Sequence, residues 1–220
     1  MDRLSRGLEA ILFDLDGTLI TCALDFPAMK QSVIDLAVAH GVPSDDLEGL
    51  DILGAAEQAA RALGEAQAPG FRARVEEELS RQEVAAAESA QPMPGALESL
   101  AALNRQGITL GIVTRNCRRA VLLSLTRVPL PHQVLLTRDD VPRPKPDPDH
   151  LLRALKLLGA RPQRSLMVGD HRMDVEAGQG AGMRTAGLGA EEAWRARFPA
   201  CCPDHHLSSL GDLLRLVGEP

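Results

Sequence analysis

Two acidic residues, Asp14 and Asp16, follow a short apolar run at residues 10–13 and precede Gly17. The run is short and bounded by a turn residue, so it predicts a buried strand. Because side chains alternate along a strand, two carboxyls that are two residues apart point to the same face. Burying two like charges together is costly unless a cation or hydrogen bonds compensate. The stretch therefore favours a metal-assisted site at the rim of a sheet, over the alternative of a solvated Asp–Gly turn.

Polar side chains also follow three later apolar runs. If the strands are parallel, all of these groups gather at one edge of the sheet. Two acids at one strand end, a hydroxyl, an amine and two further acids are the groups that phosphoryl transfer with Mg²⁺ needs. Taken singly, each residue also fits an ordinary role as a strand end, a solvated side chain or a helix cap. The later candidates are Thr114, Arg115, Asn116, Lys145, Asp170 and Asp174.

The order of these stretches along the chain is specific. It reads Asp14-x-Asp16, then Ile112-Val113-Thr114, then Lys145-Pro146, then Gly169-Asp170-x-x-x-Asp174. This pattern resembles the four motifs of the haloacid dehalogenase superfamily of phosphohydrolases, and the resemblance runs from residue 11 to about 189. It is similar to subfamily I, whose members carry a helical cap, and in particular to its phosphoglycolate phosphatase-like members.

The resemblance implies a role for each matching residue. Asp14 would attack phosphorus and form an aspartyl-phosphate. Asp16 would protonate the leaving alcohol and then activate water. Lys145 would neutralise the phosphate and the nucleophile. The phosphoryl oxygens would be held by Thr114 with the backbone amide of Arg115 or Asn116. The implied cofactor is Mg²⁺, bound by Asp14, Asp16 (through its backbone carbonyl), Asp170 and Asp174.

One departure from the family pattern follows the first motif. Many relatives have an Asp soon after the Thr-Leu of that motif, whereas this chain reads Ile20-Thr21-Cys22. The departure bears on the subgroup and leaves the chemistry intact.

The composition changes along the chain in a way that predicts two domains. Residues 20–92 are rich in Ala, Glu, Gln and Arg, which predicts helices over 27–40, 53–63 and 71–90. From Gly95 onward, helical and apolar strand patterns alternate, which predicts an α/β fold with a doubly wound, Rossmann-like parallel sheet. We therefore expect a core domain of residues 1–19 and 93–220 and an inserted helical cap domain of residues 20–92. The expected strands are 10–13, 108–113, 133–136, 165–168, 184–188 and a short one near His206, and the expected helices of the core are 95–106, 118–126, 147–158, 173–181 and 209–217.

Composition also excludes several functions. The chain of 220 residues has no Tyr, one Trp and four Phe, and its net charge is −6 without a dense basic run. It therefore lacks the stacking platforms and the positive charge that nucleic-acid binding needs. No apolar run approaches membrane-spanning length, and the N-terminal apolar stretch is too short for a signal peptide. With four cysteines that read as free thiols, we expect a cytoplasmic protein, either monomer or homodimer.

Other patterns are interpreted as structural. The glycines at 178, 180, 182, 187 and 189 fit no dinucleotide fingerprint and predict tight packing. The spacing is too cramped for a metal site in the segment that contains Cys201, Cys202, His205 and His206, and this segment is expected to lie at the surface. His171, beside Asp170, is expected to face solvent, with contact to substrate or metal as the alternative. Among the arginines of the predicted cap helices, one could reach a substrate group; these are Arg61, Arg72, Arg74 and Arg81.

The leading hypothesis is a Mg²⁺-dependent phosphatase that acts on a small phosphorylated metabolite of the phosphoglycolate or sugar phosphate class. A β-phosphoglucomutase-like phosphomutase would keep the same residues and is the main alternative. A dehalogenase has no need for Asp16, Asp170 or Asp174, which argues against that function. The remaining alternatives are a phosphorylation-responsive binding module, although known receiver domains are shorter and carry their acidic pair on a different strand, and a catalytically silent relative used for binding, which would be expected to lack a motif residue, whereas none is missing here.

Overall fold

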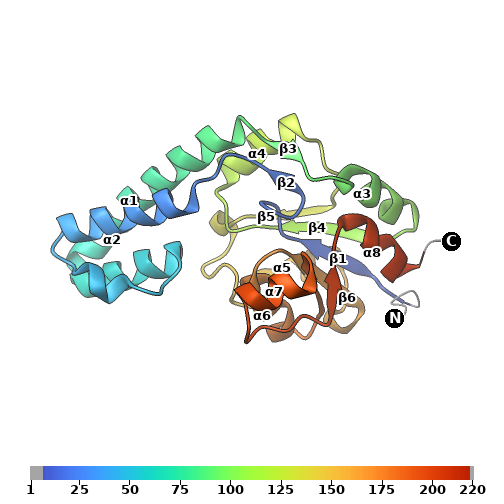
Figure 1. Cartoon of the computed structure of the whole chain (residues 1–220). Helices are drawn as coiled ribbons and strands as arrows, with labels where there is room; N and C mark the ends of the chain where they lie inside the picture. The colour runs from blue at the N-terminus through green and yellow to red at the C-terminus, as the bar shows by residue number, and fades with distance from the viewer. Residues whose placement is uncertain (1–6, 219–220) are drawn as a thin grey trace.

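The computed structural model describes residues 7–218 and has one large parallel sheet. Its six strands lie in the order β5-β4-β1-β6-β7-β8, and every neighbouring pair is parallel. β1 therefore lies in the interior of the sheet, between β4 and β6 (Figure 1). The strands are β1 (Ala10–Phe13), β4 (Thr109–Val113), β5 (Val134–Leu136), β6 (Ser165–Gly169), β7 (Arg184–Leu188) and β8 (His205–Leu207).

Helices cover both faces of this sheet, as the alternation of side chains along β1 requires. Ile11 and Phe13 pack in one hydrophobic cluster with α3 (Ala96–Arg105), α4 (Arg118–Arg127) and α8 (Leu210–Val217). Ala10 and Leu12 pack in a second cluster with α5 (Asp149–Leu158) and α6 (Arg172–Gly180). Both faces of β1 are thus buried, which explains its wholly apolar sequence. The predicted doubly wound α/β fold is confirmed.

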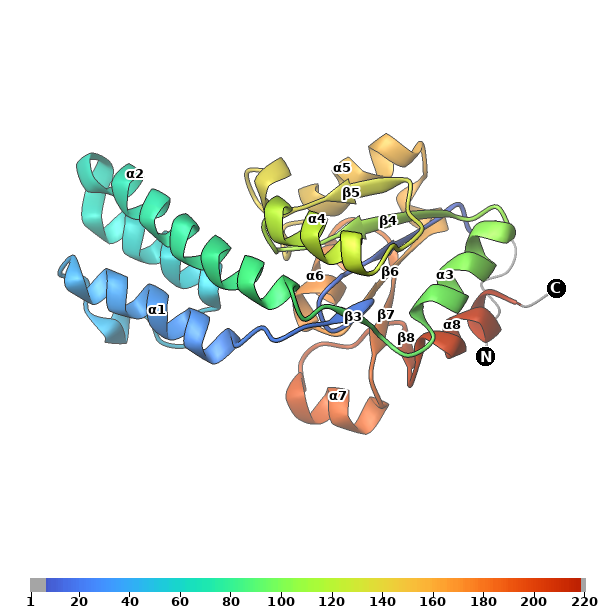
Figure 2. The ribbon, with the colours of Figure 1, turned by 90° about the horizontal axis from the view of Figure 1, so that it is seen from above.

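Residues 20–92 are mostly helical and project to one side of the sheet (Figures 1 and 2). This block contains α1 (Phe26–Ala39), a short 3-10 turn η1 (Ser44–Leu47) and α2 (Ile52–Ala87). It has a hydrophobic cluster of its own, in which Met29 and Val33 of α1 pack with Phe71 and Leu79 of α2. The packing of α1 against α2 therefore holds the block together without the sheet.

The second element of this block, α2, consists of two helical segments that meet at a kink. Gly64 has φ 74 and ψ 171, a non-helical conformation that separates the segments. The sequence predicted two helices, 53–63 and 71–90, with a gap at residues 64–70, whereas the structure has only a kink at Gly64. The second segment includes Pro69 and ends at Ala87, not at residue 90. A positive φ is strained for residues that carry a Cβ, so Gly64 is the position in this stretch where the chain can turn.

The chain passes between the sheet and the helical block through a two-stranded ribbon that the sequence did not predict. β2 (Ile20–Thr21) pairs antiparallel with β3 (Gln91–Pro92), and the Met93 amide donates to the Leu19 carbonyl at 2.9 Å. Each strand has only two residues, which is too short for a periodic pattern.

Three short helical elements lie in the connections between the strands of the large sheet. They are α7 (Glu191–Arg197), which was not predicted, and the 3-10 turns η2 (Arg138–Asp140) and η3 (Pro162–Arg164). In α7, Trp194 packs edge-on against Phe198, with ring centroids 5.2 Å apart. Within residues 7–218, no helix combines the length and the apolar character that crossing a membrane would take.

Candidate active site

The carboxyl ends of three neighbouring strands bring the predicted motifs together. The Asp14 amide donates to the Val168 carbonyl at 2.9 Å, and the Thr114 amide donates to the Leu136 carbonyl at 2.9 Å. These bonds continue the parallel pairing one residue past β1 and β4. Since β1 lies between β4 and β6, Asp14 has Thr114 on one side and Asp170 on the other. The parallel register therefore fixes the motifs at one edge of the sheet.

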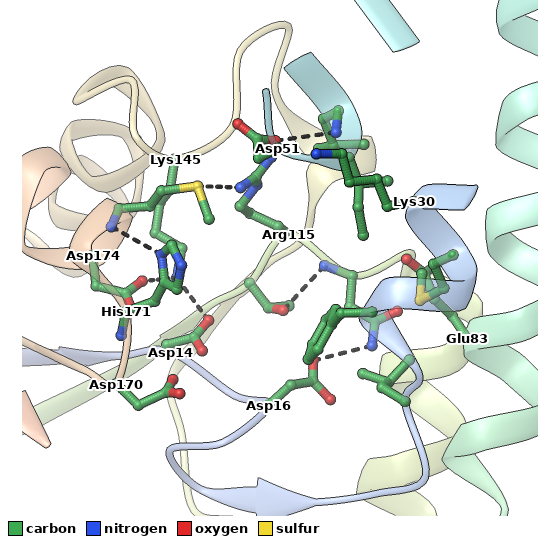
Figure 3. A pocket seen from close by; sticks show the side chains of 18 of the residues that line it. Asp14, Asp16, Lys30, Asp51, Glu83, Arg115, Lys145, Asp170, His171 and Asp174 are labelled. Atoms are coloured by element: carbon green, nitrogen blue, oxygen red, sulfur yellow. Dashed lines mark hydrogen bonds and ion pairs between the residues drawn. The ribbon is translucent and has the colours of Figure 1, made fainter. Parts of the chain in front are cut away.

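Lys145 joins two of the acids. Its Nζ lies 2.7 Å from Asp14 Oδ1 and 2.6 Å from Asp174 Oδ1, and its side chain is only 1% exposed (Figure 3). Burial alone would lower the pKa of Lys145, but the charges of Asp14 and Asp174 outweigh it and hold this pKa above its usual value. The amine is therefore a fixed positive charge beside Asp14.

Three carboxyl groups face one another at this edge. Asp14, Asp170 and Asp174 each offer an oxygen, and these oxygens lie within 4.8 Å of one another. Burial raises the pKa of Asp14 to about 6, and burial together with the Asp14 charge raises the pKa of Asp170 to about 6. The pKa of Asp174 is raised as well, first by burial. Because one lysine faces three acids, the cluster has a surplus of negative charge that a cation would neutralise.

Asp16 lies apart from this cluster. Its Oδ2 accepts a hydrogen bond from Asn116 Nδ2 at 3.1 Å, and its Oδ1 accepts one from the Cys22 thiol at 3.4 Å. Burial and the Asp14 charge together raise the pKa of Asp16 to about 6. Cys22, at the departure from the family pattern, thus contacts the second acid of the first motif directly.

Two glycines allow the acids to approach the backbone. Gly17 has φ +84, and a Cβ there would lie 2.7 Å from Asp170 Oδ2. A Cβ at Gly169 would overlap the Asp174 carboxyl. Thr18 Oγ1 donates to Asp170 Oδ1 at 3.2 Å. Both glycines are therefore positions where a side chain would displace an acid of the cluster.

The second motif is buried and holds itself in place. Thr114 is almost fully buried, and its Oγ1 accepts a hydrogen bond from the Asn116 amide at 3.1 Å. The Arg115 side chain reaches the helical block, where Nη2 lies 2.5 Å from Asp51 Oδ1, and its Nη1 contacts Met173 Sδ. Burial alone would raise the pKa of Asp51, but the Arg115 guanidinium outweighs it and holds that pKa below its usual value. Arg115 thus links the sheet edge to the N-terminus of α2.

A cavity of about 540 Å³ lies between this edge and the helical block. The sheet side supplies all of the predicted site residues, and Figure 3 shows how the labelled side chains surround the space. The helical block supplies an apolar wall with three charged residues. That wall is made of Leu24, Phe26, Pro27, Met29, Lys30, Asp51, Ile52, Leu53, Leu79 and Glu83.

The structure corrects two expectations about individual side chains. His171 does not simply face solvent: it lines the cavity, and its ring packs edge-on against Phe198 with centroids 4.8 Å apart. Burial and then the nearby Arg197 charge lower the pKa of His171 to about 4. The arginines of the helical block do not reach the cavity. Arg61 and Arg72 pair with Glu57, Arg81 pairs with Glu78, and Arg74 is not among the lining residues.

Sequence reasoning missed several residues of the site. Lys30 and Arg197 line the cavity, yet neither belongs to a motif, and the helical block and the C-terminal segment carry many other charges. His150 was missed as well: it is fully buried, and its Nδ1 accepts a hydrogen bond from the Lys145 amide at 3.2 Å. Burial lowers the pKa of His150 to about 3, so it stays neutral. A histidine directly after Asp149 in a helix gave no local signal of this contact.

The packing around Gly178 agrees with the expectation for the glycine-rich segment. A Cβ at Gly178 would lie 2.6 Å from Thr185 Cγ2, which is the tight packing expected of the glycine-rich segment. Within residues 7–218, the only group of three or more potential metal ligands is the cluster at Asp14, so Cys201 and Cys202 belong to none. All four cysteines of the chain are free.

The geometry and the comparisons with known proteins define one class. A model of the haloacid dehalogenase-like hydrolase family matches residues 11–188, so the chain belongs to this family. The predicted family and fold class are thereby confirmed.

Three individual proteins show which members of the family this chain is similar to. The chain is 36% identical over 187 residues to N-acetylmuramic acid 6-phosphate phosphatase of Pseudomonas aeruginosa, and the match spans 82% of this chain and 81% of that protein. It is 40% identical over 124 residues to pyrophosphatase PpaX of Bacillus cereus, spanning 56% of this chain and 57% of that protein. A solved haloacid dehalogenase-like hydrolase from Bacteroides fragilis is 25% identical, with a TM-score of 0.66, and the match covers 93% of this chain and 98% of that one. Both sequence relatives carry phosphatase names, which agrees with the predicted class of enzyme.

Proposed function

We propose that this protein is a Mg²⁺-dependent phosphatase that hydrolyses small phosphomonoesters through an aspartyl-phosphate at Asp14. The observation that carries the proposal is the arrangement around Asp14. One of its oxygens lies 2.7 Å from the Lys145 ammonium, and its carboxyl also belongs to the three-acid cluster with Asp170 and Asp174. A carboxylate beside a fixed positive charge and a cation site is suited to attack an anionic phosphoryl group.

The donor set fits Mg²⁺. This cation takes oxygen ligands in an octahedron with bonds of about 2.1 Å, so ligand oxygens lie up to about 4 Å apart. The carboxyl oxygens of Asp14, Asp170 and Asp174 lie within 4.8 Å of one another, and the free acids have raised pKa values that a cation would lower again. We propose these three acids as ligands, with the Asp16 carbonyl as the fourth. When bound, Mg²⁺ would neutralise charge on the phosphoryl oxygens.

Asp14 would attack phosphorus and take the phosphoryl group while the alcohol leaves. Lys145 would keep Asp14 ionised and offset the negative charge of the phosphoryl oxygens. The Thr114 hydroxyl and the backbone amide of Arg115 would donate to those oxygens. These donors are held in place before substrate binds, because Thr114 Oγ1 accepts from the Asn116 amide at 3.1 Å.

Asp16 would act first as a general acid and then as a general base. It would give its proton to the leaving alkoxide and then take a proton from the water that hydrolyses the aspartyl-phosphate. Its pKa of about 6 suits both roles near neutral pH, since both protonation states are accessible. The hydrogen bonds from Asn116 and Cys22 hold its carboxyl away from the Asp14 cluster.

We further propose that residues 20–92 act as a cap domain over a core of residues 1–19 and 93–220. The separate hydrophobic cluster and the β2–β3 ribbon support this division. Residues 1–6 and 219–220 of the proposed core lie outside the described part of the chain. A cap that lines a cavity of about 540 Å³ would admit a small metabolite of the sugar phosphate or phosphoglycolate class. The four free cysteines support a cytoplasmic location.

The test is phosphate release from a panel of phosphomonoesters by the purified protein, with Mg²⁺ and with a chelator. Asp14→Asn should abolish the release, and acid quenching of the wild-type reaction should trap one phosphoryl group on the peptide that carries Asp14. Lys156→Gln, on the exposed face of α5, is the matched control and should retain full activity. Mg²⁺-independent release, or release that survives Asp14→Asn, would refute the mechanism. Trapping of the phosphoryl group with very slow hydrolysis would favour the phosphomutase alternative.

A further inference from the structure

The cavity contains a cation that has no acidic partner. Lys30 lines it from the helical block, and across residues 7–218 no hydrogen bond or ion pair engages its side chain. The other lysine of the cavity, Lys145, is saturated by Asp14 and Asp174. Lys30 is therefore the lysine whose charge is available to a bound molecule.

The arginines of the cavity are engaged elsewhere. Arg115 pairs with Asp51 at 2.5 Å. Arg197 is exposed, and its guanidinium lies over the Phe198 ring, 4.8 Å from the centroid. Its charge opposes the rise in the pKa of Asp170 and adds to the fall in the pKa of His171, so it belongs to the sheet side of the cavity. Among the described residues that line the cavity, the helical block thus contributes one unpaired cation, Lys30.

The position of Lys30 suits contact with the part of a substrate that leaves. It lies in the second turn of α1, next to the buried Met29 and near Phe26, which also lines the cavity. Figure 3 shows Lys30 on the side of the helical block, away from Asp14 and Asp170 at the sheet edge. A phosphoryl group at Asp14 would therefore direct its alcohol portion toward Lys30.

We propose that the alcohol portion of the substrate carries a carboxylate, and that Lys30 binds it. This inference rests on the proposed phosphatase function and adds the substrate class: a phosphomonoester with a second, singly charged anionic group. The two acids of the same wall, Asp51 and Glu83, are each paired with an arginine, Arg115 and Arg138, so Lys30 is the charge of this wall that is left for the substrate. One ammonium matches one carboxylate in charge.

Matched pairs of substrates test the proposal. 6-Phosphogluconate and sorbitol 6-phosphate differ only in a carboxylate against a hydroxymethyl group. Glucose 1,6-bisphosphate and glucose 6-phosphate differ only in a second phosphate against a hydroxyl, so this pair compares a second phosphate with no second charge. We expect the wild type to prefer 6-phosphogluconate, and Lys30→Gln to lower kcat/KM for it by about tenfold to a hundredfold. The rate on sorbitol 6-phosphate should not change. Lys156→Gln, which removes the same charge outside the cavity, should leave both rates unchanged.

A binding measurement separates this inference from the proposed function. In the Asp14→Asn background, calorimetric titration with 6-phosphogluconate should show Lys30→Gln weakening the Kd by about tenfold, without any turnover. If the wild type releases phosphate equally from both members of the pair, the carboxylate proposal is overturned while the phosphatase proposal stands. If Lys30→Gln slows both members equally, Lys30 serves the phosphoryl group, and the proposal is again wrong. If no ester is hydrolysed, the phosphatase proposal fails and the titration still decides the role of Lys30.

Discussion

Arg138 connects the sheet to the helical block through a buried ion pair, and its removal should destabilise the protein strongly. Its Nη1 lies 2.5 Å from Glu83 Oε1, and both side chains are only 6% exposed. The same guanidinium binds Glu76 at 2.8 Å and donates to the Arg115 carbonyl at 3.0 Å. The second oxygen of Glu83 accepts the Cys117 amide at 3.1 Å. The pair therefore fastens α2 to the loop of the second motif.

The cost of breaking this pair depends on which partner is removed. Arg138→Met leaves Glu83 as a buried acid without its cation, and such a loss costs about 3–5 kcal/mol. Glu83→Gln should cost less, about 1–2 kcal/mol, because Glu76 still pairs with Arg138 and an amide oxygen can still accept a hydrogen bond. In the double variant no buried charge is left unpaired at Glu83. We therefore expect its cost to fall below the sum of the single costs by about 2 kcal/mol.

Urea unfolding followed by circular dichroism at pH 7 measures these free energies. All four proteins of the cycle are compared, and equal slopes against urea confirm that the compactness of the unfolded state has not changed. If the single costs add within about 0.5 kcal/mol, the two side chains act independently and the assignment of a coupled buried pair is wrong. If Arg138→Met does not fold, Glu83→Gln and the conservative Arg138→Lys still test the pair. Arg138→Lys should lose the fork to Glu76 and cost about 1–3 kcal/mol.

Three further predictions concern the site. Gly169→Ala should push the Asp174 carboxyl aside, cost about 1–3 kcal/mol of stability and lower kcat. Gly70→Ala is the control, because Gly70 lies in a helix with open space around it, and this variant should not destabilise the protein. Equal stability of the two variants would contradict the prediction. The pKa of His150 is lowered from 6.5 to about 3 in the folded state, so the unfolded state binds more protons below pH 6.5 and stability is lost as pH falls. From pH 7 to pH 4 the wild type should lose about 3 kcal/mol more than His150→Asn, and parallel pH curves would refute this. Mg²⁺ at a hundredfold its Kd should raise the free energy of unfolding by about 2.7 kcal/mol in the wild type and not in Asp170→Asn; an equal rise in both would exclude Asp170 as a ligand.

The sequence by itself determined the sheet and the residues at its edge. The alternation of apolar strands and amphipathic helices predicted the parallel fold because each strand is buried on both faces and each helix on one. Asp14, Thr114 and Asp170 each follow a strand, and parallel strands end at the same edge. Their convergence could therefore be inferred from order along the chain alone. Lys145 required the resemblance to the family, since a lysine in a loop has no pattern of its own.

Only the tertiary structure decided how the helical block meets this edge. Lys30, the link between Arg115 and Asp51, and the place of His171 in the cavity wall depend on contacts between segments far apart in the chain. The two-residue strands β2 and β3 depend on each other for pairing and carry no periodic signal of their own. Local sequence patterns report burial within one element. Which charged side chain remains unpaired in the cavity is decided when the ion pairs between elements have formed, because the same residue types occur throughout the exposed helices.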